Sequence, residues 1–262
     1  MEPVPDAAET IAAWVRDAEH LVVLTGAGIS TESGIRDFRG PQGVWTKNPE
    51  AEKTATLRFY VNDPAVRAKS WQNRLRGEYW TAEPNAGHRA LVDLERGAAL
   101  DTLVTQNIDR LHHAAGTTPD KIVELHGNVR EVKCLSCRWR APMEVALERV
   151  RAGEADPDCP KCGGILKSAT ISFGENLVAE DLIRAQRAAA RADVFLAIGT
   201  SLSVYPAAEL PEYALAHRAR LGILNAQPTP YDGDAGVVVR EPLGTSLPAI
   251  AVALGRLGIS DP

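Results

Sequence analysis

Short apolar runs bounded by turn residues recur along this chain of 262 residues. Apolar runs of roughly 4–8 residues are typical of strands that are buried on both faces of a parallel sheet. They predict strands at 20–25, 101–105, 121–125, 193–198, 221–224 and 237–239. Amphipathic helical patterns alternate with these strands, at 6–18, 85–95, 179–191, 206–217 and 246–255. Because this alternation is typical of βαβ units, the chain is predicted to have an α/β fold built on a parallel sheet.

Two segments interrupt the alternation. The segment 47–81 is rich in charged and aromatic residues but has no strand-like run, so it is predicted to be a helical insertion. The segment 127–168 contains all four cysteines and one helical stretch, at 143–150. Residues 1–46, 82–126 and 169–262 are therefore predicted to form the main domain.

Small and polar residues follow three of the predicted strands. They are Gly26 and Gly28 after the first strand, Asn107 and Asp109 after the second, and His126 after the third. In open parallel sheets, ligands bind just beyond the carboxyl ends of the strands. We therefore expect these strand ends to form one composite site, which makes the chain a candidate enzyme.

The glycines of the first loop allow the backbone to turn tightly and to approach a pyrophosphate at the start of the following helix. This signal is weak by itself. The fingerprint of dehydrogenases also requires a third glycine, where this chain has Thr31, and an acidic residue at the end of a second strand. Glu50 and Glu52 have the required spacing but lie in no predicted strand. A hydride-transfer dehydrogenase is therefore disfavoured.

His126 is the best candidate for a general base, because histidine transfers protons near neutral pH and this one lies at a strand end. Asn107 and Asp109 offer an amide and a carboxylate that can hold a carboxamide and a water. An isolated Asn-x-Asp is nevertheless more often an Asx turn with a helix cap.

Other polar positions extend this candidate site. In the loop that follows residue 33, Arg39 can pair with a phosphate and Phe38 can cover a planar group, although a solvated loop with one buried aromatic is the alternative. Thr200 and Ser201 follow another strand, and Asn225 follows the next. Hydroxyls and backbone amides there suit the phosphate and ribose of a nucleotide.

The cysteines form two C-x-x-C pairs, Cys134 with Cys137 and Cys159 with Cys162. In a reducing compartment this arrangement is typical of a tetrahedral zinc site in a small ribbon with little core of its own. Two disulfides or a redox-active dithiol are the alternatives.

Composition limits the functional classes. The formal net charge of −5 argues against general affinity for nucleic acid. The first residues lack the basic region and apolar core of a signal peptide, and no apolar run approaches the roughly 18–20 residues of a membrane span. We therefore expect a cytoplasmic protein that has no direct contact with membrane or nucleic acid.

Taken together, the motifs GAGIS, DFRG, TQNID, LHGN, ISFGENL and GTSL, with the paired cysteines between them, resemble the sirtuins. Sirtuins are NAD-dependent protein deacylases, and the resemblance covers about residues 20–245. It implies a doubly wound, Rossmann-like NAD domain with an inserted zinc ribbon and a small helical module. It also implies NAD as a consumed co-substrate, one structural zinc and an acyl-lysine protein or peptide as substrate.

The resemblance assigns individual residues. For NAD it implies contacts with Gly26, Ala27, Gly28, Ser30, Asp37, Phe38, Arg39, Gln106, Asn107, Ile108, Asp109, Gly199, Thr200, Ser201, Asn225 and Leu243. For the acyl-lysine peptide it implies contacts with Ile171, Phe173, Gly174, Glu175 and Val204. Backbone recognition by strand addition is the implied mode of peptide binding.

The implied reaction begins when the amide oxygen of acyl-lysine attacks C1′ of the nicotinamide ribose and nicotinamide leaves. His126 then assists deprotonation of a ribose hydroxyl, and water finally releases lysine and O-acyl-ADP-ribose. A mono-ADP-ribosyltransferase that uses the same site is the alternative enzyme, and a non-catalytic zinc-ribbon binding module is the alternative without chemistry. Because Asn107, Asp109 and His126 are all present, the last alternative is disfavoured.

Two further features concern loop geometry and the choice of acyl group. Arg110 stands where sirtuins commonly have glycine. Trp71 and Arg74 lie three residues apart on one predicted helix face, where sirtuins that prefer acidic acyl groups carry a tyrosine and an arginine. Since the tyrosine is absent, we expect an exposed Arg74 beside a packed Trp71, and acetyl or longer apolar acyl groups as substrates. The alternative is that Arg74 lies at the far end of the acyl tunnel and receives a succinyl or malonyl carboxylate.

Overall fold

The computed structural model of the chain describes residues 6–97 and 100–258. Its centre is a six-stranded sheet in the order β3-β2-β1-β7-β8-β9, and all neighbouring strands are parallel. The strands are β1 (Leu21–Thr25), β2 (Leu100–Thr105), β3 (Ile122–Glu124), β7 (Val194–Ile198), β8 (Arg220–Leu224) and β9 (Val237–Val239). Because the chain runs outward from β1 in one direction and from β7 in the other, the sheet is doubly wound, as predicted.

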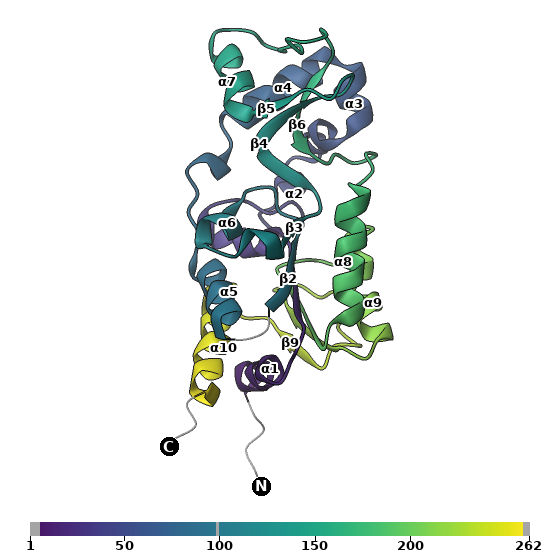
Figure 1. The fold of residues 1–262 in the computed structure, drawn as a ribbon. Helices are drawn as coiled ribbons and strands as arrows, with labels where there is room; N and C mark the ends of the chain where they lie inside the picture. The colour runs from purple at the N-terminus through teal and green to yellow at the C-terminus, as the bar shows by residue number, and fades with distance from the viewer. Residues whose placement is uncertain (1–5, 98–99, 259–262) are drawn as a thin grey trace.

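Helices cover both faces of this sheet (Figure 1). The core on one face contains side chains of α1 (Ala7–Arg16), α5 (Ala86–Gly97) and α10 (Leu243–Gly258). The core on the other face contains side chains of α8 (Ala179–Arg191) and α9 (Leu210–Ala216). Successive residues of β1 enter opposite cores, and this explains why its apolar run is continuous rather than alternating.

The strand register brings the carboxyl ends of the central strands to one level. Thr25, the last residue of β1, is paired with Thr105 of β2 and with Ile198 of β7, and Thr105 is paired in turn with Glu124 of β3. The loops that follow these strands therefore leave the sheet together. The change in winding direction falls between β1 and β7, which is where ligands of such sheets bind.

A small lobe, residues 44–80 and 127–170, lies beyond this edge of the sheet (Figure 1). Its first part is helical, as predicted, with α2 (Val44–Lys47), η2 (Pro49–Ala55), α3 (Leu57–Asn62), α4 (Pro64–Leu75) and η3 (Glu78–Trp80). Its second part is an antiparallel sheet in the order β5-β4-β6 with one helix. These elements are β4 (Gly127–Cys134), β5 (Arg140–Pro142), α7 (Met143–Arg151) and β6 (Leu166–Thr170).

The expectation that the ribbon has little core is wrong. Val132, Met143 and Leu147 are buried in one cluster with two of the cysteines. Trp71 of α4 is 1% exposed and belongs to the same cluster. The ribbon and the helical insertion therefore pack on each other through a shared apolar core.

Element boundaries differ from the sequence prediction at a few places. The glycine loop leads into a 3₁₀ helix, η1 (Ala27–Ser33), and the segment 206–217 is divided between η5 (Ala207–Glu209) and α9. The last helix begins at Leu243 because Glu32 accepts a hydrogen bond from the backbone N–H of Gly244, at 2.8 Å. This contact joins distant parts of the chain, so local sequence patterns do not reveal it. The short elements α6 (Leu111–Ala115) and η4 (Pro119–Lys121) complete the fold.

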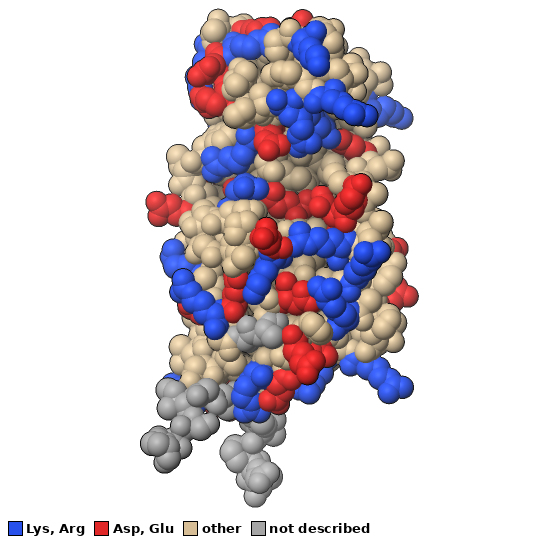
Figure 2. All heavy atoms as spheres, viewed as in Figure 1, with Lys and Arg blue, Asp and Glu red and all other residues tan. Residues whose placement is uncertain are grey.

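On the face shown in Figure 2, acidic and basic side chains are interspersed, in keeping with the similar numbers of the two, 34 and 29. Among the described residues, no helix combines the length and apolar character that crossing a membrane requires. Residues 1–5, on which the expectation about a signal peptide rests, lie outside the described residues.

Candidate active site

A cavity of about 1450 Å³ lies between the carboxyl edge of the large sheet and the small lobe. Loops after β1, β2, β3, β7 and β8 contribute to its wall, together with side chains of α4 and β6. All residues predicted for NAD, for the peptide and for catalysis line this one cavity. They are Gly26, Ala27, Gly28, Ser30, Asp37, Phe38, Arg39, Gln106, Asn107, Ile108, Asp109, His126, Ile171, Phe173, Gly174, Glu175, Gly199, Thr200, Ser201, Val204, Asn225 and Leu243.

The glycines after β1 allow two loops to touch. The N–H of Gly28 donates a hydrogen bond to the carbonyl of Gly199, which follows β7, at 2.8 Å. A Cβ on Gly26 would lie 2.7 Å from the carbonyl oxygen of Gly199, and one on Gly28 would lie 2.7 Å from its Cα. Only glycine fits at either position, so the loop packs against the neighbouring strand end while its backbone stays open to the cavity.

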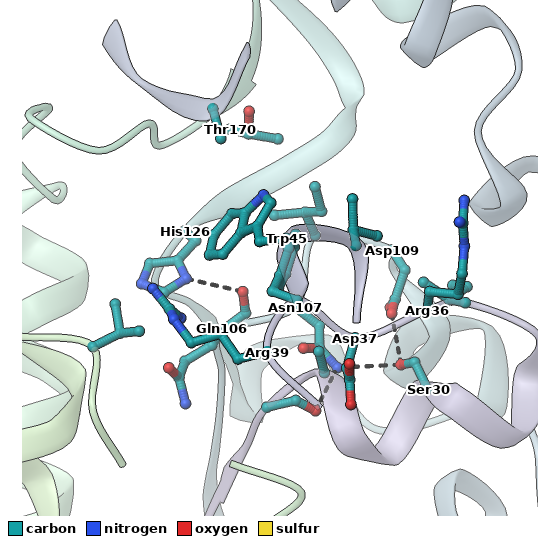
Figure 3. Close-up of a pocket in the computed structure, with 18 of the residues that line it drawn as sticks. Ser30, Arg36, Asp37, Arg39, Trp45, Gln106, Asn107, Asp109, His126 and Thr170 are labelled. Atoms are coloured by element: carbon teal, nitrogen blue, oxygen red, sulfur yellow. Dashed lines mark hydrogen bonds between the residues drawn. The ribbon is translucent and has the colours of Figure 1, made fainter. Parts of the chain in front are cut away.

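Asn107, Ser30 and Asp109 form a buried hydrogen-bonded group on the cavity wall (Figure 3). The side-chain amide of Asn107 donates to the carbonyl of Gly26 at 3.0 Å and to Ser30 Oγ at 3.2 Å. Ser30 Oγ donates in turn to Asp109 at 2.7 Å. Because both amide hydrogens of Asn107 are held by the glycine loop, its Oδ1 is left to accept a hydrogen bond from a ligand.

Asp109 has two functions in this group. Its Oδ1 also accepts a hydrogen bond from the N–H of Leu111 at 2.9 Å, which is an Asx turn at the start of α6, so that part of the alternative interpretation of the Asn-x-Asp motif is confirmed. The N-cap residue of α6 is Arg110 and not Asp109. Burial raises the pKa of Asp109, although the hydrogen bonds from Leu111 and Ser30 oppose this effect. A carboxylate in this environment favours a nearby positive charge.

His126 is half-buried, and its Nδ1 lies 3.0 Å from the backbone carbonyl of Gln106 (Figure 3). A carbonyl oxygen accepts hydrogen bonds but donates none, so Nδ1 carries the proton in neutral His126. Nε2 then has a free lone pair. Burial lowers the pKa of His126, with the Gln106 carbonyl acting in the opposite direction. The neutral, proton-accepting form is thus favoured near neutral pH, which suits a general base.

Aromatic rings and one guanidinium form another part of the wall. The rings of Phe38 and Trp45 are 4.5 Å apart, and those of Trp45 and Phe173 are 5.4 Å apart. The guanidinium of Arg39 lies 4.7 Å from the centre of the Trp45 ring. Sequence reasoning did not single out Trp45, since its ring reaches the cavity only through the fold of the loop 33–45.

Lys167 is a second cavity residue that sequence reasoning missed. It is 2% exposed, and its Nζ lies 3.0 Å from a carboxylate oxygen of Glu175, which also pairs with Lys133. Burial lowers the pKa of Lys167 to about 8, with Glu175 opposing the shift. Burial acts to raise the pKa of Glu175, but the two lysines hold it below its ordinary value. No local pattern marks Lys167, because its partner lies beyond the end of its own strand.

The expectation of an exposed Arg74 is wrong. Trp71 is buried as expected, but Arg74 is only half-exposed, lines the cavity and donates a hydrogen bond to Thr170 Oγ1 at 3.3 Å. The hydroxyl of Ser168 lies 2.8 Å from Thr170 Oγ1. This end of the cavity is therefore polar and carries positive charge.

The four cysteines lie apart from the cavity, in the ribbon. Their Sγ atoms are all within 4.8 Å of one another, with 3.6 Å between Cys134 and Cys162 and 3.8 Å between Cys137 and Cys159. All four are free thiols, so the disulfide alternative does not apply. Tetrahedral zinc with bonds of about 2.3 Å to sulfur spaces its ligands about 3.8 Å apart. The cluster fits zinc, and four protein ligands leave no position for a catalytic water.

A doubly wound sheet with a cavity at the point where its winding direction changes is typical of nucleotide-binding α/β proteins. The inserted four-cysteine ribbon further restricts which of these proteins the chain can be grouped with. The model of the Sir2 family matches residues 26–206. The chain belongs to the Sir2 family.

Relatives support this assignment over most of the chain. NAD-dependent protein deacetylase 2 of Streptomyces coelicolor is 49% identical over 235 residues, which are 90% of this chain and 98% of that protein. An NAD-dependent protein deacetylase of Caldivirga maquilingensis is 43% identical over 222 residues, 85% of this chain and 84% of that protein.

Solved structures agree in fold. A Sir2 enzyme structure superposes with a TM-score of 0.88 at 37% identity, covering 97% of this chain and 100% of that chain. A Sir2 variant with deacetylated p53 peptide and 3′-O-acetyl ADP ribose gives a TM-score of 0.84 at 32% identity. The match covers 92% of this chain and 96% of that chain.

Proposed function

We propose that this chain is an NAD-dependent protein-lysine deacylase that releases nicotinamide and O-acyl-ADP-ribose. The observation that carries the proposal is the arrangement of His126 and the Asn107–Asp109 group on one cavity wall, with Nε2 of His126 free to accept a proton. The relatives named NAD-dependent protein deacetylases support it. So does the Sir2 structure that contains both a deacetylated peptide and 3′-O-acetyl ADP ribose.

NAD is the proposed co-substrate, and the loops at the switch point would hold it. The backbone of Gly26 and Gly28, with the hydroxyl groups of Thr200 and Ser201, suits the pyrophosphate and ribose. Gln106 donates a hydrogen bond to Thr200 at 2.9 Å and so ties the loop after β2 to the loop after β7. These residues bind and orient the dinucleotide, while the Asn107–Asp109 group faces its nicotinamide end.

The acyl-lysine peptide would lie between the segments 172–175 and 203–205. Phe173 is fixed by backbone hydrogen bonds, since its N–H donates to Ala55 at 2.8 Å and its carbonyl accepts from Leu57 at 2.9 Å. Gly174, Glu175 and Val204 line the cavity beside it. A peptide that enters here can form hydrogen bonds with backbone groups of these segments. Because such bonds do not involve the peptide's side chains, they select only weakly for its sequence.

Two further parts of the proposal concern organisation and location. We assign residues 1–46, 82–126 and 169–262 to the NAD-binding domain, 47–81 to the helical insertion and 127–168 to the zinc ribbon. We place the protein in the cytoplasm, where a four-thiolate zinc site remains reduced.

The test is nicotinamide release from NAD in the presence of lysine peptides that carry acyl groups of different length. We expect release to depend on the acylated peptide and to be absent with the unacylated one. Equal release with both peptides would contradict a deacylase. Mass spectrometry of the peptide separates the enzyme classes, because a mono-ADP-ribosyltransferase adds mass to it. The deacetylase relatives do not favour that alternative.

The choice of acyl group gives a second prediction. Acetyl or longer apolar acyl groups are the proposed substrates, and they carry no charge for Arg74 to pair with. A succinyl chain ends in a carboxylate that the Arg74 guanidinium can pair with. Replacing Arg74 by methionine should therefore lower kcat/KM for a succinyl-lysine peptide by about tenfold, the value of one charged hydrogen bond, and leave acetyl-lysine within about twofold.

Arg58→Met is the matched control, because Arg58 is an exposed arginine of the neighbouring helix that does not line the cavity. It should change neither rate. If Arg74→Met leaves kcat/KM for the succinyl-lysine peptide unchanged, Arg74 does not bind the acyl group and its role is limited to the hydrogen bond with Thr170.

A further inference from the structure

Arg110 has a backbone conformation that residues with a side chain rarely adopt. Its φ of 69° and ψ of 16° lie in the left-handed region, where the Cβ crowds the backbone and glycine is favoured. It directly follows Asp109, whose carboxylate belongs to the active-site group. Backbone strain beside a functional residue persists only where surrounding contacts hold it.

The contact that holds Arg110 is an ion pair with Glu124. Nη1 of Arg110 donates to Glu124 Oε2 at 2.9 Å, and the side chains are 37% and 16% exposed. The amide of Asn128 donates to the same oxygen at 3.1 Å, and His113 Nδ1 lies 3.9 Å from the other oxygen. One carboxylate therefore joins the segment after β2 to the end of β3 and the start of β4.

These three segments carry the residues that the reaction needs. Asp109 precedes Arg110, and His126 stands midway between Glu124 and Asn128 in sequence. Neither Arg110 nor Glu124 lines the cavity, so any effect of these side chains on the site acts through neighbouring residues.

We propose that Arg110 and Glu124 are positioning residues for the deacylase reaction. Their ion pair holds the strained backbone after Asp109 and keeps the Asp109 loop and the His126 loop in register. This inference rests on the proposed function, because it assigns the pair a role in the same site. It predicts an effect on NAD binding and turnover that exceeds any effect on folding.

The chain offers a matched control in Arg218. This arginine also has a left-handed backbone, with φ of 66°, but it is exposed and lies in the turn before β8, away from the cavity. Replacing either arginine by alanine keeps a Cβ in a strained position and removes one side chain. Replacing either by glycine removes the side chain and the strain together.

The experiment measures NAD affinity by calorimetry, together with kcat and KM for NAD, in the full chain. We expect Arg110→Ala to lower kcat/KM about 10–100-fold, the range for a misplaced catalytic group, and to weaken NAD binding. Arg110→Gly should recover part of both losses, since its backbone adopts the conformation freely. Glu124→Gln should behave like Arg110→Ala. Arg218→Ala should leave affinity, kcat and KM within about twofold.

Several outcomes would overturn the inference. One is an Arg110→Ala variant that matches Arg218→Ala in NAD affinity and in both kinetic constants. Another is an Arg110→Gly variant that is no better than Arg110→Ala. If Arg110→Ala fails to fold, Arg110→Gly is compared with Arg218→Gly instead. Equal NAD affinity and equal kinetic constants in these two variants would then overturn the inference. An inactive wild type would contradict the proposed function instead. The NAD affinities of the Arg110 and Arg218 variants would still test the positioning role in that case.

Discussion

The His126→Ala variant should lose deacylation while it still binds NAD. Loss of a general base typically lowers a rate about 10²–10⁴-fold, and no other neutral imidazole lines the described cavity. In the proposed reaction, nicotinamide leaves before the step that needs the base, so exchange of labelled nicotinamide into NAD should persist. The measurement compares deacylated peptide and exchanged nicotinamide in one reaction mixture.

His217→Ala is the control for this variant. Nδ1 of His217 also lies close to a backbone carbonyl, that of Tyr213 at 2.9 Å, but the residue is exposed and outside the cavity. Its removal should change neither activity. Near wild-type deacylation by His126→Ala would remove this histidine from the mechanism.

The same role sets the direction of the pH dependence. The base must be neutral, and burial lowers the pKa of His126 below the ordinary value of 6.5. Deacylation should therefore persist as the pH falls through 6.5 and decline only when the pH reaches the lowered pKa. A profile of kcat/KM against pH that already declines above 6.5 would disagree with this assignment.

The Cys159→Ser variant should bind zinc much more weakly and destabilise the small lobe. Apparent zinc-binding free energies of small zinc-dependent folds are about 10–16 kcal/mol at neutral pH. Losing one of the four ligands removes part of a free energy that is as large as the roughly 5–15 kcal/mol that stabilises a whole domain, so the variant should be clearly less stable than the wild type. Because Cys159 shares a core with Trp71 of α4, the change should also disturb the cavity end around Arg74.

Metal analysis and thermal unfolding test this prediction, with the wild type expected to hold one zinc per chain. Cys159→His is the matched variant, since histidine also ligates zinc, and it should retain metal and structure better than the serine variant. Well-folded, active protein without zinc would refute the structural role of the metal.

Most of the fold could be predicted from the sequence because its signals are local. Every residue of β1 and β7 is buried, and the continuous apolar runs of these strands predict burial on both faces of the sheet. The small and polar residues that follow these strands were predicted to share a site, since parallel strands end at one edge of a sheet. The C-x-x-C spacing likewise identified the cysteine cluster.

Features that depend on packing between distant segments could not be predicted. Lys167 and Arg74 reach the cavity because the ribbon packs on α4 through a common core. The bridge between Thr56 and Phe173 joins the helical insertion to the segment after β6. The ion pair of Arg110 likewise involves Glu124 from another strand. In each case the deciding contact lies far away along the chain.

In the proposed function, this cavity transfers an acyl group from lysine to the ADP-ribose part of NAD. Mass spectrometry of all products, after incubation with NAD and an acetyl-lysine peptide, tests it most directly. We expect equal amounts of deacetylated peptide, nicotinamide and O-acetyl-ADP-ribose. A peptide that keeps its acetyl group and gains ADP-ribose, or NAD cleaved without acyl transfer, would contradict it.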